Sequence, residues 1–229
     1  MNEFISYLAS HRDKSPRIPS LIELAQKLGV SVGKLREQME VARSLGFVEV
    51  HPRTGIWALP YSFFPAVDES LQYAIACDRN AFHQFGELRI RVEAAFFAEA
   101  AGALKDTEFV RLRELIANAR QKLSARPALI PHDEHRGLHL TIFSKLNNPF
   151  VTGVLEAYWS AYEAQGLSLY ADFHYLQQVW DFHDQMVEAI IRGQLGEAED
   201  AFTKHTKLLR HREGRGGGKA EPLYVSSHA

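Results

Sequence analysis

The sequence predicts a mainly α-helical protein in two parts: a small N-terminal unit of helices closed by a β-hairpin, and a larger all-α helical domain. Two observations support this fold class. Residues 1–60 contain helical apolar spacings followed by two short strand-like runs, whereas no strand-like alternation appears after residue 60. Beyond that point the helical stretches are separated by breaks at Asn147-Asn148-Pro149, Gly166, Gly193 and Gly196.

Three helices are predicted in the first part. The first ends near Ser15-Pro16. The second begins after Ser20, whose hydroxyl suits an N-cap, and ends at Gly29, a residue type that favours helix C-termini. The third begins after Ser31 and ends at Gly46 by the same logic. Each helix carries an apolar stripe at helical spacing, so we expect the three to pack around one small core.

A β-hairpin is predicted after the third helix. Residues 47–50 and 56–59 are typical of short strands, and residues 51–55 contain the proline and glycine of a turn. The order helix, helix, turn, helix, hairpin is that of a winged helix-turn-helix. We therefore expect a DNA-binding domain over residues 1–60.

The rest of the chain is expected to hold one further domain. Residues 61–66 follow Pro60 and include Pro65, and they are interpreted as a linker. Residues 67–210 are helical almost throughout, which predicts an all-helical bundle. Residues 211–229 are rich in glycine and charge, so we expect a loose tail.

Composition argues against a uniformly basic nucleic-acid-binding protein, a disulfide-bonded protein and a membrane protein. The 229 residues are 46% hydrophobic and 24% charged with a net charge of −2, so any contact with nucleic acid must come from a local patch. The single cysteine, Cys77, cannot form an internal disulfide. The N-terminus has no secretory signal, and no apolar run reaches the length of a membrane helix. We therefore expect a cytoplasmic protein with no membrane partner.

Candidate DNA contacts lie on the third helix and at the hairpin tip. In a helix-turn-helix the second helix of the motif enters the major groove, and its N-terminal side chains reach base edges. The candidates are Ser31, Lys34, Arg36 and Gln38 on this helix, and Arg53 in the turn. The alternative is an ordinary solvated helix face, since residues 1–60 hold only eight Lys or Arg against six Asp or Glu, a net charge of +2. Double-stranded operator DNA with two half-sites would require a homodimer.

These segments also resemble the N-terminal domain of GntR-family regulators. The similarity is carried by residues 19–31, 35–37 and 45–50, with Arg53 and Gly55 on the wing. Two positions depart from the family pattern. The arginine that usually follows the serine is Val32 here, and the proline or threonine before the Leu-Arg-Glu triplet is Lys34. Val32 removes one donor to DNA, which Lys34 partly replaces, so an unusual operator is expected.

Four of the eleven histidines have spacings that suit a metal site. His135 and His139 are four residues apart, so both rings project from one helix face. His183 and His205 are 22 residues apart on two helices that can form an antiparallel hairpin at Gly193. Neutral imidazoles suit a divalent transition metal such as Zn²⁺ or Ni²⁺. The alternative is a set of core and surface histidines with no ligand role.

The helical region resembles the FCD sensor domain, named after the C-terminal domain of FadR, which follows the winged helix in one large GntR subgroup. The matching stretches are 87–95, Leu138-His139, Asn148-Pro149, His183 with 188–190, Gly193, and His205. In the metal-binding members the site is one Asp and three His. The resemblance places His139, His183 and His205 on the three His positions and His135 on the Asp position.

The same resemblance implies an effector contact at Arg89. Arg89 shares a helix stripe with Val92 and Phe96, so it is expected to point inward, where a guanidinium would bind a small carboxylate effector. The alternative is a local ion pair with Glu93, four residues later. Aromatic residues that line either a pocket or the core are Tyr158, Trp159, Tyr162, Tyr175 and Trp180.

The expected function is therefore a DNA-binding transcriptional regulator of GntR type, controlled by a small organic acid bound in a metal-containing helical domain. Two other classes stay open: a metal-responsive sensor and a helical metal-dependent enzyme. An enzyme is not expected, because the segment from His135 to His139 has no glutamate between its histidines and no placed general base is evident. A ligand-binding module that has lost DNA binding is a third possibility.

Overall fold

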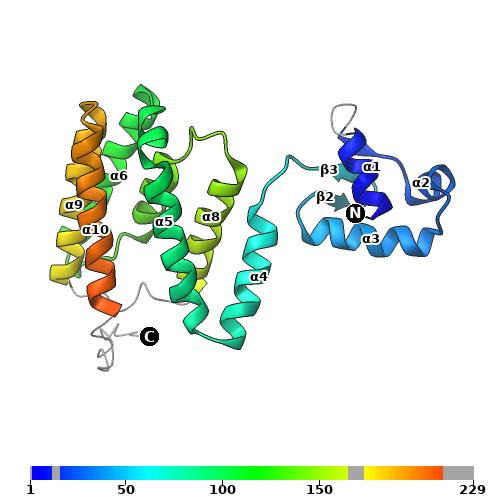
Figure 1. Ribbon diagram of the computed structural model, residues 1–229, viewed down its shortest axis with the longest axis horizontal. Coiled ribbons are helices and arrows are strands. Elements are labelled where there is room, and N and C mark those ends of the chain that lie inside the picture. Colours follow the sequence, from blue (N-terminus) through cyan, green and yellow to red (C-terminus); the bar gives the residue numbers. More distant parts are fainter. Residues whose placement is uncertain (1, 12–15, 165–172, 214–229) are drawn as a thin grey trace. The chain divides into compact units, whose positions relative to one another are not determined.

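The computed structural model describes residues 2–11, 16–164 and 173–213, with side chains of the last helix described up to residue 208. The chain divides into two compact units, Met1–Ser70 and Leu71–Ala229, and most of their elements are labelled in Figure 1. Among the described residues, no helix combines the length and the apolar character that crossing a bilayer would require.

The first unit consists of three helices and a three-stranded antiparallel sheet. Its elements are α1 (Glu3–His11), β1 (Arg17–Ile18), α2 (Leu21–Leu28), α3 (Val32–Ser44), β2 (Val48–His51) and β3 (Gly55–Ala58). The strand order is β1-β3-β2, and Ile18 and Val50 both lie opposite Ile56. Phe4 and Leu35 are completely buried in its core. Three helices and a hairpin in this order confirm the predicted winged helix-turn-helix.

The helix ends follow the capping chemistry of the sequence. The Ser20 hydroxyl accepts from the backbone N–H of Glu23, while the Glu23 carboxylate accepts from the backbone N–H of Ser20, which forms a capping box at α2. Helix α2 ends at Gly29, whose φ of 67° is the left-handed conformation that glycine adopts at low cost. Ser31 caps α3 in turn, so α3 begins one residue after this serine.

Strand β1 was not predicted from the sequence. It is only two residues long and lies between Pro16 and Pro19, so no alternating pattern could mark it. The strand exists because β3 has a free edge: the backbone N–H of Ala58 donates to the carbonyl of Pro16 at 2.6 Å, and Ile18 is buried in the core.

A helical bundle makes up the second unit, and its first helix begins before the unit boundary at Ser70 and earlier than expected. The helices are α4 (Phe64–Cys77), α5 (Asn80–Gly102), α6 (Asp106–Ser124), α7 (His132–Ile142), α8 (Pro149–Ala164), α9 (Phe173–Ile191) and α10 (Leu195–Glu213). Helix α4 starts inside the predicted linker 61–66. Pro65 lies in its first turn, where the missing N–H of proline costs nothing. The Ser62 hydroxyl accepts from the backbone N–H of Phe64 at 3.2 Å, just before the helix. Of the predicted tail 211–229, residues 211–213 belong to α10 and residues 214–229 lie outside the described residues.

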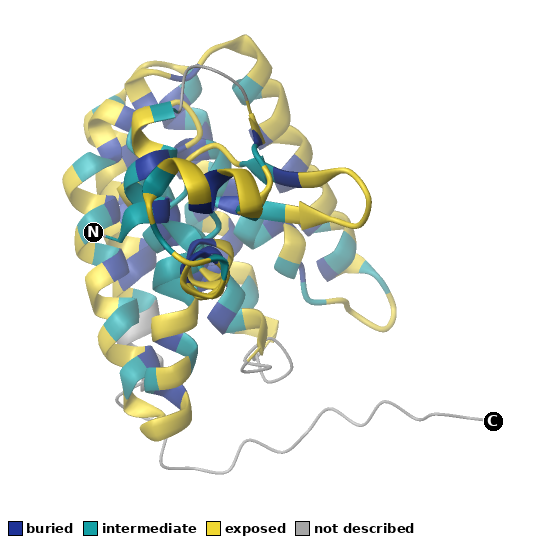
Figure 2. Cartoon of the chain, turned by 90° about the vertical axis from the view of Figure 1, so that its right-hand side faces the viewer, coloured by how far each residue is buried: buried dark blue, intermediate teal, exposed yellow. Residues whose placement is uncertain are grey.

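Two packing arrangements in the bundle position the candidate site. Helices α9 and α10 pack against each other as a hairpin whose turn contains Gly193, with a φ of 73°. Helix α5 packs on α7, α8 and α10, and α6 packs on α7 and α9. In Figure 2 the helices are striped with buried and exposed residues, as expected for amphipathic helices around a core. Trp159 and Trp180 are among the largest fully buried side chains.

Candidate metal centre

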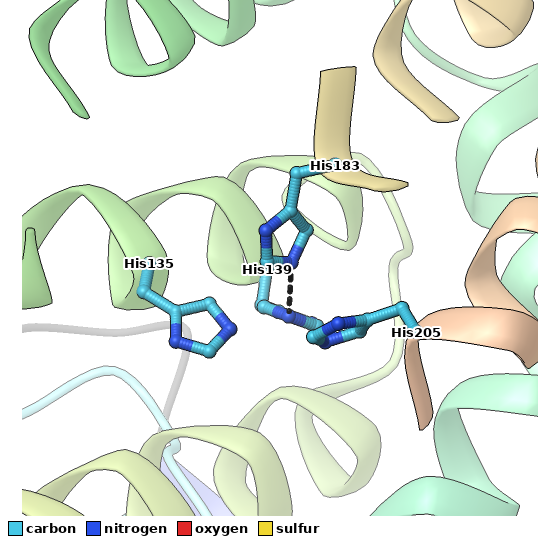
Figure 3. Close-up of side chains that lie close together, drawn as sticks. All are labelled: His135, His139, His183 and His205. Atoms are coloured by element: carbon cyan, nitrogen blue, oxygen red, sulfur yellow. Dashed lines mark hydrogen bonds between the residues drawn. The ribbon is translucent and has the colours of Figure 1, made fainter. Parts of the chain in front are cut away.

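Four histidine side chains converge inside the helical unit (Figure 3). Helix α7 supplies His135 and His139, α9 supplies His183, and α10 supplies His205. One ring nitrogen from each of the four lies within 4.8 Å of the others, which is an arrangement that could hold a metal ion. His139, His183 and His205 are completely buried, and His135 is half-buried. The spacing of four residues along α7 and the turn between α9 and α10 bring them together.

The distances inside the cluster fit a metal ion. The Nε2 atoms of His139 and His183 are 3.4 Å apart. Two imidazole nitrogens bound to one tetrahedral Zn²⁺ at about 2.0–2.1 Å each would be separated by about 3.3–3.4 Å. Both ring nitrogens of His205, Nδ1 of His183 and Nε2 of His135 are buried without a hydrogen-bond partner. Because a buried polar atom without a partner is costly, a ligand that takes up these lone pairs would stabilise the cluster.

The electrostatic environment keeps the cluster in the form that binds metals. Burial lowers the pKa of His135, His183 and His205 well below the usual value of 6.5, and the neighbouring imidazoles and Arg89 lower the pKa of His135 and His183 further. His205 is subject to the same repulsion from His139 and Arg89. At neutral pH these imidazoles are therefore uncharged and able to donate lone pairs to a cation.

Glu93 of α5 also belongs to this site. From the sequence, Glu93 was expected only as a possible ion-pair partner of Arg89. Its carboxylate is completely buried and accepts from His139 Nδ1–H at 2.9 Å and from Arg89 Nη1–H at 2.9 Å. Burial raises the pKa of Glu93, but the charge of Arg89 and the interaction with His139 outweigh it, so the pKa is lowered overall. Since Nδ1 of His139 carries the proton in this bond, its Nε2 lone pair faces the other histidines. A carboxylate behind a ligating histidine is a common arrangement in metal sites.

Arg89 is completely buried beside this array, and it makes the local ion pair considered above. Its guanidinium lies 4.3 Å from the ring centre of Tyr158 and 5.5 Å from that of Trp159. Only Nη1 has a hydrogen-bond partner, Glu93, whereas Nε and Nη2 have none. These two atoms form one edge of the planar guanidinium, and that edge matches the two oxygens of a carboxylate. Trp159 Nε1 is also buried without a partner.

A small cavity lies next to the cluster. Its volume is about 20 Å³, and its lining includes His132, His135, Tyr162, Tyr175 and Trp180. A space of this size holds about one water molecule. Trp159 and Trp180 are buried against His135, with ring centres 4.7 and 6.1 Å away. Trp159 and Trp180 thus lie against the histidines, and a ligand larger than water could enter this cavity only if side chains moved.

The candidate DNA-contacting residues of the first unit lie in different environments. Arg36 is exposed on α3, and Arg53 is exposed at the tip of the hairpin with a φ of 71°, an uncommon value for a residue other than glycine. The Ser31 hydroxyl accepts from the backbone N–H of Lys34 at 3.2 Å, so it caps the helix. Lys34 is half-exposed and forms an ion pair with Glu3.

Gln38, which was predicted to contact DNA, does not lie on the exposed face of α3. It is buried, accepts from the backbone N–H of Phe4 at 2.9 Å, and donates to Glu3. The reason is its position on α3: Gln38 follows Leu35 by three residues and precedes Met39 and Ala42, all of which are buried against the core. Gln38 therefore joins α3 to α1 and is not presented to a groove of DNA.

A winged helix-turn-helix followed by a helical bundle is the organisation of a DNA-binding transcriptional regulator of GntR type. The chain belongs to the FCD domain family, which matches residues 84–208 and thus contains all four histidines, Glu93 and Arg89. This assignment confirms the predicted GntR regulator with an FCD domain.

Two known proteins are similar to this chain along most of its length. The chain is 28% identical over 199 residues, 84% of its own length and 83% of the relative's, to a protein of Escherichia coli strain K12 named "Uncharacterized HTH-type transcriptional regulator YieP". Among solved structures, "Streptococcus agalactiae GntR" is 18% identical with a TM-score of 0.66, and the match covers 90% of this chain and 95% of that one. The name of the Escherichia coli relative describes a transcriptional regulator.

Proposed function

We propose that this regulator binds operator DNA as a homodimer and that a small carboxylate, bound beside a metal ion in the FCD domain, controls its DNA affinity. The observation that carries this proposal is the buried array of four histidines, Glu93 and Arg89, in which several nitrogens have no hydrogen-bond partner. Such an array is costly in a protein interior unless ligands complete it. Since its target would be chromosomal DNA, we also infer a cytoplasmic location.

His135, His139, His183 and His205 would hold the metal ion, and Zn²⁺ or Ni²⁺ suits four imidazole ligands. None of the four is anionic, so a bound divalent ion would keep its full charge, with Glu93 balancing only part of it through His139. The ion would supply positive charge to attract an anionic effector. The chain's own residues would hold and orient that anion.

Arg89 is the proposed anchor of the effector. The free Nε–Nη2 edge favours a carboxylate bound through both oxygens, and Tyr158 and Trp159 lie against the guanidinium. Because the neighbouring cavity of about 20 Å³ is too small for such an anion, binding would require helices or side chains around it to move. A ligand that binds one conformation better than another shifts the population toward it, and this shift would be the signal sent to the DNA-binding domains.

DNA binding is assigned to the exposed part of α3 and to the wing, with Ser31 and Lys34 at the start of α3. Both arginines are exposed, and we expect Arg36 to reach the major groove and Arg53 to reach phosphate or the minor groove. We expect Arg36→Ala to weaken binding to DNA from upstream of its own gene by about 1–3 kcal/mol, that is, roughly 5- to 150-fold. Fluorescence anisotropy at several salt concentrations would measure the change.

Arg43→Ala is the matched control for Arg36→Ala. Arg43 lies in the last turn of the same helix and pairs with Glu40 at 2.7 Å, so its loss should leave DNA affinity almost unchanged. Equal affinity of the Arg36→Ala variant and the wild type would remove α3 from the proposed interface.

The effector site is tested by Arg89→Lys, which keeps the positive charge but removes the two-donor edge. Acetate, succinate and citrate serve as mono-, di- and tricarboxylate probes, added to the Zn²⁺-loaded protein on DNA. We expect at least one probe to change the DNA affinity of the wild type, and Arg89→Lys to weaken that probe's action at least tenfold while leaving affinity without probe intact. An unchanged response in the variant would exclude Arg89 as the anchor.

A metal-responsive sensor is the second candidate, and the small cavity favours it. If no carboxylate enters, the ion itself would be the signal, and DNA affinity would follow Zn²⁺ or Ni²⁺ concentration alone. A titration of metal-free protein on DNA with each ion, in a buffer without carboxylates, distinguishes the two. A metal-dependent change in affinity that no carboxylate probe modifies would favour the sensor.

A further inference from the structure

Glu3, in the first turn of α1, connects two residues of the α3 helix. One carboxylate oxygen accepts from Lys34 Nζ at 2.5 Å, and the other accepts from Gln38 Nε2 at 2.5 Å. The ion pair between Glu3 and Lys34 stays accessible, since the side chains are 40% and 51% exposed. Both oxygens of this carboxylate are thus engaged by the helix that is expected to face DNA.

The Glu3 carboxylate is held in its charged form at every pH used for DNA binding. The hydrogen bond from Lys34, together with bonds from its own backbone and from Gln38, lowers the pKa of Glu3 from 4.5 to about 2. The negative oxygen that faces the Lys34 ammonium offers it the same contact as an oxygen of a DNA phosphate. Lys34 cannot make both contacts fully at once.

We propose that Glu3 is an internal competitor for the DNA backbone: its carboxylate occupies Lys34 in the way a phosphate would, and it lowers the affinity for DNA irrespective of sequence. The inference rests on the proposed role of α3 in DNA binding. Each phosphate that approaches Lys34 must displace Glu3 and is also repelled by its charge. Phosphate contacts carry no sequence information, so the effect is the same on operator and random DNA. Glu3 therefore limits how long the regulator stays on the excess of non-operator DNA.

The test is the salt dependence of DNA binding by the wild type, Glu3→Gln, Lys34→Ala and the double variant. Glu3→Gln keeps the shape and a hydrogen-bonding group for Gln38 but removes the charge. We expect it to bind operator and random duplex DNA roughly 3- to 10-fold more tightly at low salt, with a log–log salt slope steeper by about 0.9, the value of one additional phosphate contact. The gain should disappear in the Lys34→Ala background: the double variant should bind DNA no more tightly than Lys34→Ala alone.

The remaining outcomes of this experiment would contradict the proposal. Glu3→Gln with an unchanged melting temperature but wild-type or weaker affinity would overturn the proposal. So would a double variant that binds DNA more tightly than Lys34→Ala by the same factor, because the gain would then not act through Lys34. If Glu3→Gln folds poorly, Glu3→Ala, which also removes the charge, takes its place in the same comparison. If the wild type itself binds no DNA, the role of α3 fails and the competitor role fails with it, a result distinct from either of the others.

Discussion

We expect Zn²⁺ to raise the thermal unfolding midpoint of the metal-free protein by roughly 8–16 °C when its free concentration is about a thousand times its dissociation constant. A ligand that binds only the folded state at that excess stabilises it by about 4 kcal/mol. In a protein of this size each kcal/mol shifts the midpoint by about 2–4 °C. Replacing one completely buried ligand, as in His183→Ala, should abolish most of this shift, because three imidazoles with a vacated position hold the ion far less tightly. Differential scanning calorimetry with and without Zn²⁺ measures both.

His83→Ala is the control for this experiment. His83 is an exposed residue on α5 in the same unit, outside the cluster, so this variant should keep the full Zn²⁺ shift. Elemental analysis of the purified proteins should find one ion per chain in the wild type and His83→Ala, and much less in His183→Ala. The same shift and the same metal content in all three proteins would show that the histidine cluster does not bind the ion.

Glu93→Ala is expected to destabilise the protein by about 3–5 kcal/mol, since it leaves the guanidinium of Arg89 buried without its partner. It also removes the acceptor of the His139 Nδ1 proton, so the affinity for Zn²⁺ should fall roughly 10- to 100-fold. Urea unfolding at neutral pH and a competitive Zn²⁺ titration measure the two effects. If the variant lost stability but kept its affinity for Zn²⁺, Glu93 would act only as the ion-pair partner of Arg89 and would have no role in metal binding.

Glu87→Ala provides a matched comparison on the same helix. Glu87 and Arg91 have the same four-residue spacing, and their side chains are 59% and 65% exposed, so this substitution should change stability by no more than about 0.5 kcal/mol. The two pairs differ in burial, which is therefore the variable that the comparison isolates.

The contribution of Glu93 also has a defined pH range. Its pKa in the folded protein lies below the ordinary value of 4.5, so as pH falls the unfolded chain takes up the proton first. The stabilisation is therefore complete above about pH 4.5 and is lost as the pH falls toward the lowered folded pKa. Glu93→Ala should lack this component of acid destabilisation.

The sequence could predict those features that depend on local spacing. Apolar periodicity and the caps at Ser20, Gly29 and Ser31 place the helices of the winged helix-turn-helix, because these signals act within a few residues of the chain. The four-residue spacing of His135 and His139 places both rings on one side of α7 for the same reason. Strand β1 escaped prediction because only its partner strand defines it.

Contacts between distant parts of the chain were not predictable in the same way. Glu93 and His139 are 46 residues apart, and only the packing of α5 on α7 shows that one carboxylate serves both His139 and Arg89. Gln38 resembles a surface residue of a recognition helix, yet it is turned toward α1. In both cases a polar residue is buried, and burial of polar groups depends on partners that a single helix pattern does not contain.

The position of His205 on α10 has a consequence for local unfolding. Terminal helices of a bundle usually open more often than the core, in small fluctuations that leave the rest folded. An ion bound to His205 on α10, His183 on α9 and two residues of α7 would join these helices, so α10 could not detach without releasing the ion. Hydrogen exchange of the α10 amides would then slow toward the rate set by global unfolding, and the metal would determine whether this helix behaves as an independent segment or as part of one cooperative unit.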